Sequence, residues 1–268
     1  MVIGMRLFHK VAVVTGGAAG IGRAICLGYA KEGADIVVAD INLAGAEETA
    51  QAVRALGRNA IALRTDVTKV DDVEAMVSKT RSVLGRIDIL VNNAGKFAEI
   101  PFDECTVEQW DEIVNVNLRS VLICTRAVVP VMLEQGGGRI INFGGTASYR
   151  GRPDQEAYTA AKHGIVNITK GCAAQLGVNG INVNAIAPGI VDTDSLENFR
   201  DKPEKQRRVI DRMPLNRMGT PEDMVGPAIF LASDDSRFIT GEMLIVDGGA
   251  NMRVDGCGTD RAPSLITQ

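Results

Sequence analysis

The sequence has few cysteines, histidines and aromatic residues. Its five cysteines form no CxxC pair, and their odd, scattered number does not fit a disulfide framework. Two histidines, His9 and His163, stand far apart, so the sequence predicts no metal site. An N-terminal signal-peptide core is missing, because Arg6, His9 and Lys10 interrupt that stretch. Reduced cysteines and no signal peptide favour a cytoplasmic protein.

Long uncharged apolar runs and an excess of positive charge are missing too. Arg126 interrupts the best candidate for a membrane span, residues 121–133. The formal net charge of −4 gives no general attraction to nucleic acid or to an anionic membrane. We therefore expect neither as a partner. With 46% hydrophobic residues, the 268-residue chain has the composition of a globular protein with a sizeable core.

Residues 10–22, KVAVVTGGAAGIG, join a short apolar run to a glycine-rich turn and the start of a helical pattern. The run is rich in β-branched residues, which is typical of a central parallel strand buried on both faces. Strand, glycine turn and helix form the first unit of a dinucleotide-binding fold, where a pyrophosphate meets backbone N–H groups. By itself the turn also fits an ordinary connection between a strand and a helix.

The three glycines of this turn have separate expected roles. Gly16 would form the tight turn, Gly20 would let the backbone approach a phosphate, and Gly22 would allow close packing of helix on strand. Their spacing is Gly-x-x-x-Gly-x-Gly, which differs from the commoner Gly-x-Gly-x-x-Gly fingerprint.

Apolar runs alternate with segments of helical period along the rest of the chain. The expected strands are residues 11–14, 36–39, 60–63, 87–91, 139–143, 181–186 and 242–246, and the expected helices include 44–56, 70–84, 107–133, 157–176 and 221–231. This alternation predicts one α/β domain over residues 1–268, a Rossmann-like doubly wound parallel sheet. With right-handed crossovers, we expect about seven strands in the order 3-2-1-4-5-6-7 and helices on both faces.

Two residues of the second half indicate a chemistry. Tyr158 and Lys162 are four residues apart on a predicted helix and therefore share one face. A tyrosine hydroxyl, with a reference pKa near 10, is a poor acid or base at neutral pH. A neighbouring ammonium favours the phenolate, so we expect Lys162 to lower the pKa of Tyr158 and allow proton exchange with an alcohol or carbonyl.

The chain resembles a short-chain dehydrogenase/reductase of the classical type from about Phe8 to Gly249. The motifs that carry the resemblance are Thr15-Gly16-x-x-x-Gly20-Ile21-Gly22, Asp66-Val67, Asn92-Asn93-Ala94-Gly95, Asn117, Tyr158-x-x-x-Lys162, Pro188-Gly189 and Asp247-Gly248-Gly249. Seven motifs in the family's order and at its spacing are very specific for this family.

The resemblance implies the role of each residue. Lys162 would also hold the nicotinamide ribose, and Asn117 would support a water-mediated proton relay to it. Asn93 to Gly95 would line the adenosine side, Asp66 and Val67 would flank the adenine, and residues 188–193 would close over the nicotinamide and diphosphate. The cofactor-binding residues expected from the turn, the second strand and the resemblance are Gly16, Ala19, Gly20, Ile21, Gly22, Asp40, Ile41, Asp66, Val67, Asn93, Ala94, Gly95, Tyr158, Lys162, Pro188, Gly189, Val191 and Thr193.

One position departs from the family's pattern. The family places a serine that polarises the substrate carbonyl thirteen residues before the catalytic tyrosine, and here that position is Gly145. Glycine cannot donate a hydrogen bond from a side chain. Thr146 or Ser148 could supply the hydroxyl as a catalytic residue, water or the substrate itself could take its place, or turnover could be weakened. Thr146 is the nearest hydroxyl.

The cofactor is expected to be NAD. The second strand ends at Asp40, whose carboxylate would accept hydrogen bonds from both adenine-ribose hydroxyls and repel a 2′-phosphate. Neither Ile41-Asn42 nor the glycine turn supplies a positive charge. The alternative is that Asp40 only caps the following helix.

The expected function is NAD(H)-dependent interconversion of a secondary alcohol and a ketone, with a small carbonyl or alcohol substrate. Alternatives are reduction of an imine or activated alkene, a dehydration, or a nucleotide-binding protein with weakened catalysis. Residues 192–214, polar and weakly periodic, are expected to form a lid over the site, and 250–268 a C-terminal tail. The family resemblance implies a homotetramer, with a dimer as the alternative.

Overall fold

The computed structural model describes residues 4–193, 196, 203–211 and 213–252. Its strands form a single parallel sheet in the order β3-β2-β1-β4-β5-β6-β7, which confirms the predicted fold and strand order. The strands are β1 (Val11–Thr15), β2 (Asp35–Asp40), β3 (Ala60–Arg64), β4 (Ile89–Asn92), β5 (Gly138–Phe143), β6 (Ile181–Pro188) and β7 (Met243–Val246).

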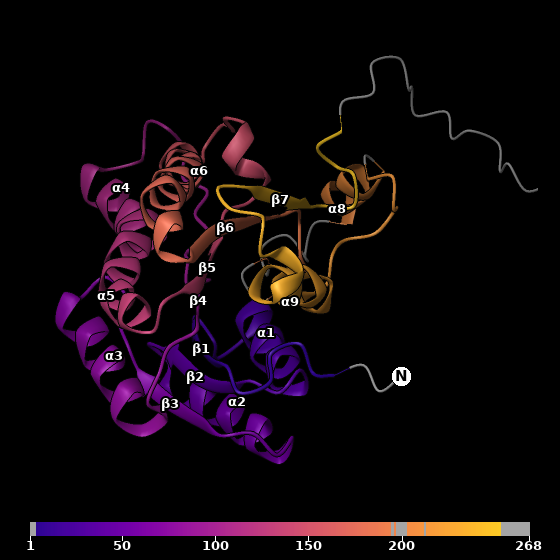
Figure 1. The fold of residues 1–268 in the computed structure, drawn as a ribbon. Helices are drawn as coiled ribbons and strands as arrows, with labels where there is room; N and C mark the ends of the chain where they lie inside the picture. Colours follow the sequence, from indigo (N-terminus) through magenta and orange to yellow (C-terminus); the bar gives the residue numbers. More distant parts are fainter. Residues whose placement is uncertain (1–3, 194–195, 197–202, 212, 253–268) are drawn as a thin grey trace, which may run out of the picture.

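Helices cover both faces of this sheet (Figure 1). The α-helices are α1 (Gly20–Lys31), α2 (Leu43–Ala55), α3 (Val70–Leu84), α4 (Val107–Val114), α5 (Ser120–Glu134), α6 (Glu156–Leu176), α8 (Pro203–Ile210) and α9 (Val225–Ala232). Short 3₁₀ segments are η2 (Thr146–Tyr149), η3 (Gly177–Asn179), η5 (Pro221–Met224) and η6 (Asp234–Ser236). In Figure 1, α1, α2 and α9 lie on one side of the sheet, and α3 to α6 on the other.

Strand β1 shows why the apolar runs are continuous. Ala12 and Val14 pack into the core cluster under α1, α2 and α9, whereas Val11 and Val13 pack into the cluster under α3 and α5. Successive side chains of a strand point to opposite faces, so a strand covered on both sides needs apolar residues at every position. The short run therefore predicted the centre of the sheet correctly.

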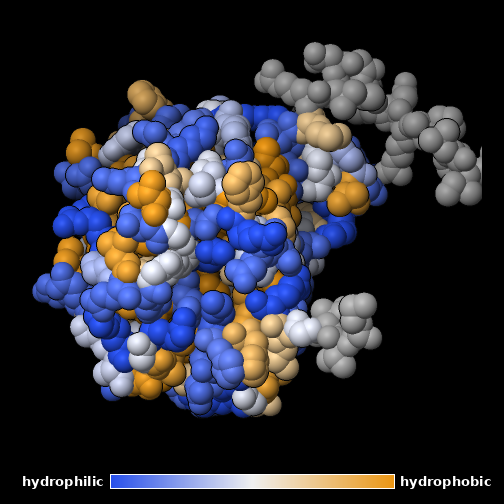
Figure 2. Space-filling model, viewed as in Figure 1, coloured by the Kyte–Doolittle hydropathy of each residue, from blue (hydrophilic) through white to orange (hydrophobic). Residues whose placement is uncertain are grey.

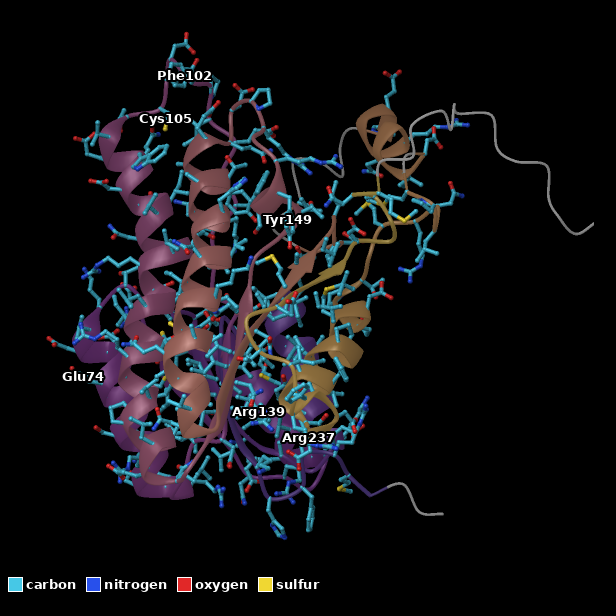
Figure 3. The ribbon with its side chains drawn as sticks, turned by 45° about the horizontal axis from the view of Figure 1, so that its top comes forward. Glu74, Phe102, Cys105, Arg139, Tyr149 and Arg237 are labelled. Atoms are coloured by element: carbon cyan, nitrogen blue, oxygen red, sulfur yellow. The ribbon has the colours of Figure 1, made fainter. Side chains whose placement is uncertain are left out.

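The predicted helix over residues 107–133 is interrupted by one turn of π-helix. Segment η1 (Asn115–Arg119) separates α4 from α5, and the three together run from Val107 to Glu134. By length and composition this helix could cross a membrane, but it packs against α3, α6 and the sheet, which explains those of its apolar residues that are buried. Figure 3 shows it beside α6, with Phe102 and Cys105 in the loop that precedes α4.

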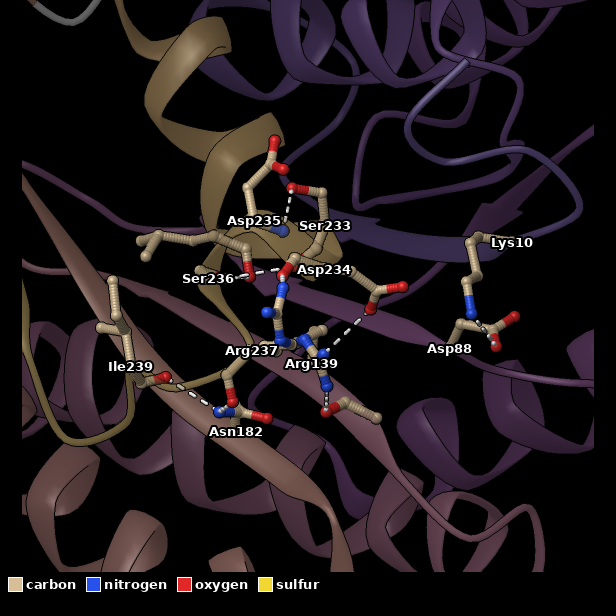
Figure 4. A network of polar contacts seen from close by, with 12 residues as sticks. Lys10, Asp88, Arg139, Asn182, Ser233, Asp234, Asp235, Ser236, Arg237 and Ile239 are labelled. Carbon is tan, nitrogen blue, oxygen red and sulfur yellow. Dashed lines mark hydrogen bonds and ion pairs between the residues drawn. The ribbon is translucent and has the colours of Figure 1, made fainter. Parts of the chain in front are cut away.

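Polar contacts close the amino edge of the sheet near the start of β5 and β6 (Figure 4). The side-chain amide of Asn182 donates to the carbonyls of Arg237 and Ile239 at 3.2 and 2.9 Å. The guanidinium of Arg139 lies 3.3 Å from the carboxylate of Asp234. These contacts stabilise the amino edge of the sheet. In folds of this kind a ligand binds at the opposite edge, outside the carboxyl ends of the parallel strands.

Candidate active site

A cleft of about 470 Å³ opens at the carboxyl edge of the sheet. Its wall is formed by the turn after β1, the ends of β2, β4, β5 and β6, and the first turns of α6. Predicted site residues that line it are Gly16, Ala19, Gly20, Ile21, Asp40, Asn93, Ala94, Gly95, Asn117, Thr146, Tyr158, Lys162, Pro188, Gly189, Val191 and Thr193. The fold therefore gathers residues from most of the chain at one edge.

The glycine turn has no room for side chains. Gly16 has φ +65°, and a Cβ added to it would lie 2.9 Å from Nδ2 of Asn93. A Cβ on Gly22 would lie 2.0 Å from the carbonyl oxygen of Gly16, so only glycine lets α1 pack against the turn. Gly20 has φ +51° and faces the methyl group of Thr193 at 3.3 Å. This bare backbone at the start of a helix fits the diphosphate of a dinucleotide.

Asn93 and Thr15 tie the ends of β1 and β4 together beneath this turn. Asn93 Nδ2 donates to the carbonyls of Thr15 and Gly16 at 3.0 and 3.1 Å. The hydroxyl of Thr15 accepts from the backbone N–H groups of Asn93 and Ala94, each at 3.1 Å. Asn93 thus holds the backbone of the glycine turn in place through its side-chain amide. Thr15, which the sequence analysis did not assign to the site, has the same role.

Asp40 is held at the edge of the cleft by two backbone donors. Its Oδ2 accepts from the N–H of Ala18 at 3.0 Å, and its Oδ1 accepts from the N–H of Asn42 at 2.9 Å. The cap of α2 is Asn42, whose side chain accepts from the N–H of Gly45 at 3.1 Å. Asp40 is therefore not the cap of α2, and its oriented carboxylate faces the cleft.

Tyr158 and Lys162 lie one turn apart near the start of α6. The ammonium of Lys162 is 5.6 Å from the centre of the Tyr158 ring and donates to the carbonyl of Phe143 at 2.9 Å. Lys162 is only 5% exposed, and this burial lowers its pKa to about 8. On the other side, the ring of Phe97 meets Tyr158 edge-on at 5.3 Å.

The expected lowering of the Tyr158 pKa is wrong for the chain by itself. Burial raises this pKa to about 12, and the charge of Arg152 opposes the rise only in part. The physical reason is that losing water disfavours the phenolate by more than the charge of Arg152 favours it.

Asn117 stands in the π-helical turn and clamps the backbone beside Lys162. Its Nδ2 donates to the carbonyls of Lys96 and Ile113, both at 2.9 Å, and its Oδ1 accepts from the N–H of Lys96 at 3.2 Å. A Cβ on Gly95 would lie 2.8 Å from this oxygen and 3.7 Å from Nζ of Lys162. Asn117 therefore positions the loop after β4 against Lys162, and the expected water relay stays a prediction.

Gly145 leaves open space beside the tyrosine hydroxyl. Its backbone is extended, with φ 160°, and an added Cβ would meet nothing closer than 3.9 Å, with the Tyr158 hydroxyl at 4.0 Å. Thr146 lines the cleft, whereas Ser148 does not. The Ser148 hydroxyl is buried and donates to the carbonyl of Lys162 at 2.8 Å. Of the two candidate hydroxyls, only Thr146 is brought to the site.

Four expected cofactor-binding residues do not line this cleft: Gly22, Ile41, Asp66 and Val67. The carboxylate of Asp66 accepts from the N–H and hydroxyl of Thr68 at 2.9 and 2.7 Å, and these bonds lower its pKa. Val67 is buried in the core, and Ile41 is 61% exposed. Of the predicted lid, residues 194–195, 197–202 and 212 lie outside the described part, as do residues 253–268 of the predicted tail.

Several cleft residues were not predicted from the sequence, and two of them are polar residues next to Tyr158. Arg152 and Gln155 line the cleft from the loop between η2 and α6. Their only signal in the sequence is their closeness to Tyr158, which does not show where their side chains lie.

Known proteins resemble this chain over nearly its whole length. A family model described as enoyl-(acyl carrier protein) reductase matches residues 16–251. The 2-dehydro-3-deoxy-D-gluconate 5-dehydrogenase of Escherichia coli is 39% identical over 90% of this chain and 94% of its own length. The 3-oxoacyl-[acyl-carrier-protein] reductase FabG of Thermotoga maritima is 38% identical over 91% of this chain and 99% of its own.

Solved structures agree with these matches. A putative short-chain alcohol dehydrogenase from Sinorhizobium meliloti superposes with a TM-score of 0.89 at 35% identity, covering 92% of this chain and 98% of that one. A putative NAD(P) dependent gluconate 5-dehydrogenase from Beutenbergia cavernae, with bound NADP, gives 0.88 at 37% identity over the same shares. Sequence, fold and cleft together show that this chain belongs to the short-chain dehydrogenase/reductase family of nicotinamide-dependent oxidoreductases acting on alcohol and carbonyl groups.

Proposed function

We propose that the protein uses NAD(H) to interconvert a secondary alcohol and a ketone, with Tyr158 as the group that exchanges the proton. The observation that carries this proposal is the pairing of Tyr158 with the buried ammonium of Lys162 at the wall of the cleft that begins at the glycine turn. Relatives named as a sugar-acid dehydrogenase and an oxoacyl reductase support an alcohol and a ketone as the reacting groups.

The chain supplies binding, orientation and the proton. A bound nicotinamide supplies or accepts the hydride at the reacting carbon. The Tyr158 hydroxyl donates its proton to the substrate oxygen in reduction and takes it back in oxidation. Lys162, held by the carbonyl of Phe143, places a positive charge beside the ring and favours the phenolate when the proton leaves. Asn117 keeps the backbone next to this ammonium in place.

The choice of NAD rests on Asp40. The two backbone donors fix its carboxylate at the adenosine end of the cleft, where it would accept from ribose hydroxyls and repel a 2′-phosphate. Arg64 is the register partner of Asp40, but its guanidinium is 3.8 Å from the carboxylate of Asp72. Two structural neighbours contain bound NADP, so the preference of this chain needs its own measurement.

Gly145 favours a second candidate function. The family's serine polarises a carbonyl, and Gly145 has no hydroxyl to replace it. Reduction of an imine or activated alkene, or a dehydration, does not need that hydroxyl, so its absence would not slow these reactions. Weakened catalysis on ordinary ketones follows from the same absence.

The test is a substrate panel read by NADH absorbance. It contains simple secondary alcohols together with D-gluconate and 3-hydroxybutyrate, each acid paired with its own amide, and it is run with NAD and with NADP. Oxidation of at least one alcohol, lost in Tyr158→Phe while NADH still binds, supports the proposal. Binding of NADH without oxidation of any member, together with reduction of an imine or alkene probe, would favour the second candidate.

Assembly and location are part of the proposal as well. A homotetramer, with a dimer as the alternative, is supported by exposed apolar side chains on the α4–α5 helix: Val107, Trp110, Leu122 and Leu133. Ile113, Val121 and Val128 of the same helix are already buried in the protomer, and Leu122 is 45% exposed. Apolar groups reach the surface at several places among hydrophilic ones (Figure 2).

A cytoplasmic location is supported by the free thiols of Cys26, Cys105, Cys124 and Cys172.

A further inference from the structure

The cleft carries an excess of positive charge at its substrate end. The described residues that line it include three cations, Lys96, Arg152 and Lys162, and a single carboxylate, Asp40. Asp40 lies at the opposite, adenosine end, where backbone N–H groups hold it. Among the described lining residues, no other carboxylate is available to pair with these cations inside the cleft.

Two of the three cations already have partners. Lys96 pairs with Glu112 at 2.6 Å, and Lys162 is buried with its ammonium on the carbonyl of Phe143. Arg152 differs, because within the described part of the chain it forms no ion pair. Its Nη2 approaches the hydroxyl of Thr146 at 3.5 Å. Toward the described residues, most donors of this guanidinium at the wall of the cleft are unused.

The surroundings of Arg152 form a polar pocket next to the reacting centre. Gln155 is only 8% exposed and lines the cleft, and no hydrogen bond engages its side-chain amide among the described residues. Thr146 brings a hydroxyl, and Gly145 leaves the space between these groups and Tyr158 free of side chains. A cation, an amide and a hydroxyl around one open space are the groups that bind a carboxylate.

We propose that Arg152 is the specificity-determining residue of this enzyme and that it binds the carboxylate of a hydroxy-acid or oxo-acid substrate. The proposal deepens the proposed function and rests on it. A planar carboxylate matches the fork of one guanidinium, while Gln155 and Thr146 can donate to its remaining lone pairs or to a substrate hydroxyl. The cofactor diphosphate has a separate cradle in the glycine turn, so Arg152 is free for the substrate.

The acid and amide members of the panel test this assignment. The two differ in charge but hardly in shape, so their ratio of kcat/KM isolates the recognition of the carboxylate. We expect the unmodified protein to prefer the acid by about tenfold to a hundredfold, which is the range of a charge-assisted hydrogen bond. Arg152→Gln should bring this ratio close to one, mainly through KM, and Arg152→Lys should keep part of it.

Arg150 provides the matched control. It stands two residues away in the same loop, does not line the cleft, and donates to the carbonyl of Asn251 at 3.1 Å. Arg150→Gln should keep the full preference for the acid. An unchanged ratio in Arg152→Gln, or an equal loss in Arg150→Gln, would overturn the assignment.

A binding experiment separates this inference from the proposed function. Calorimetry on the NADH-bound protein measures the affinity for D-gluconate and for its amide without any turnover. Tighter binding of the acid that Arg152→Gln abolishes supports the inference even if no alcohol is oxidised. Equal binding of acid and amide overturns it even if alcohols are oxidised. Weaker NADH binding in Arg152→Gln would assign the residue to the cofactor and would also overturn it.

Discussion

Replacing Gly145 by serine should raise the activity on ordinary ketones. The backbone of Gly145 is extended, so any residue can adopt it, and an added Cβ would touch nothing within 3.9 Å. That Cβ would lie 4.0 Å from the Tyr158 hydroxyl. A serine oxygen extends one bond further into the same space, where it can donate to a substrate oxygen that Tyr158 holds at about 2.7 Å.

The size of the effect follows from the worth of one donor at a developing oxyanion. A preorganised donor contributes roughly 3–4 kcal/mol, or about a hundredfold to a thousandfold in rate. A transplanted serine lacks neighbours that fix its rotamer, so we expect a rise of about tenfold or more in kcat, which corresponds to about 1.4 kcal/mol. The gain should appear in kcat rather than KM, because the bond strengthens as charge develops.

The assay is NADH-dependent reduction of simple ketones by Gly145→Ser, with Gly145→Ala as the matched control. Alanine adds the same Cβ without the hydroxyl, so it measures the steric part of the change alone. A serine variant no faster than the alanine variant would refute the reasoning. If Thr146 has taken over the role, Thr146→Val should instead abolish most of the activity of the unmodified protein. If neither substitution changes turnover, no protein hydroxyl polarises the carbonyl.

Four further predictions concern the catalytic tyrosine, the cofactor, the buried lysine and the assembly. Tyr158→Phe should lower turnover by at least about 10²–10⁴-fold with little change in NADH affinity measured by fluorescence, and retained turnover would remove Tyr158 from the mechanism. The unmodified protein should show a much higher kcat/KM with NAD than with NADP, and Asp40→Ala combined with Ile41→Arg should narrow or reverse this preference; equal values before mutation would contradict the role of Asp40. The buried Lys162 has a pKa lowered to about 8, so above that pH the unfolded chain binds a proton that the folded chain has lost. The free energy of unfolding should therefore rise between pH 8 and 10 by about 2–3 kcal/mol more than in Lys162→Met. The same pH dependence of denaturation in both proteins would contradict this prediction. Light scattering at micromolar concentration should report a tetramer or a dimer, and a monomer would contradict the proposed assembly.

Local sequence determined the sheet and the cofactor turn. Strands β1 and β2 are buried on both faces and are apolar at nearly every position, so the runs at residues 11–14 and 36–39 were visible without any tertiary information. Gly22 could be assigned for a similar reason, because a glycine at fixed spacing after a strand reflects a backbone contact within the same short segment. The same holds for the capping box of Thr106 and Gln109, which lies within four residues of sequence and starts α4.

Only the tertiary structure decided which polar groups meet in the cleft. Ser148 and Thr146 are equivalent in the sequence, but Ser148 donates to the carbonyl of Lys162 across fourteen positions, and only Thr146 faces the substrate space. The pKa of Tyr158 depends on how much water the packed walls remove, which no spacing reveals. Arg152 stands near Tyr158 in the chain, yet only the fold shows that no carboxylate of the described residues pairs with it. Burial and pairing are properties of distant contacts, so they become defined only when the chain is folded.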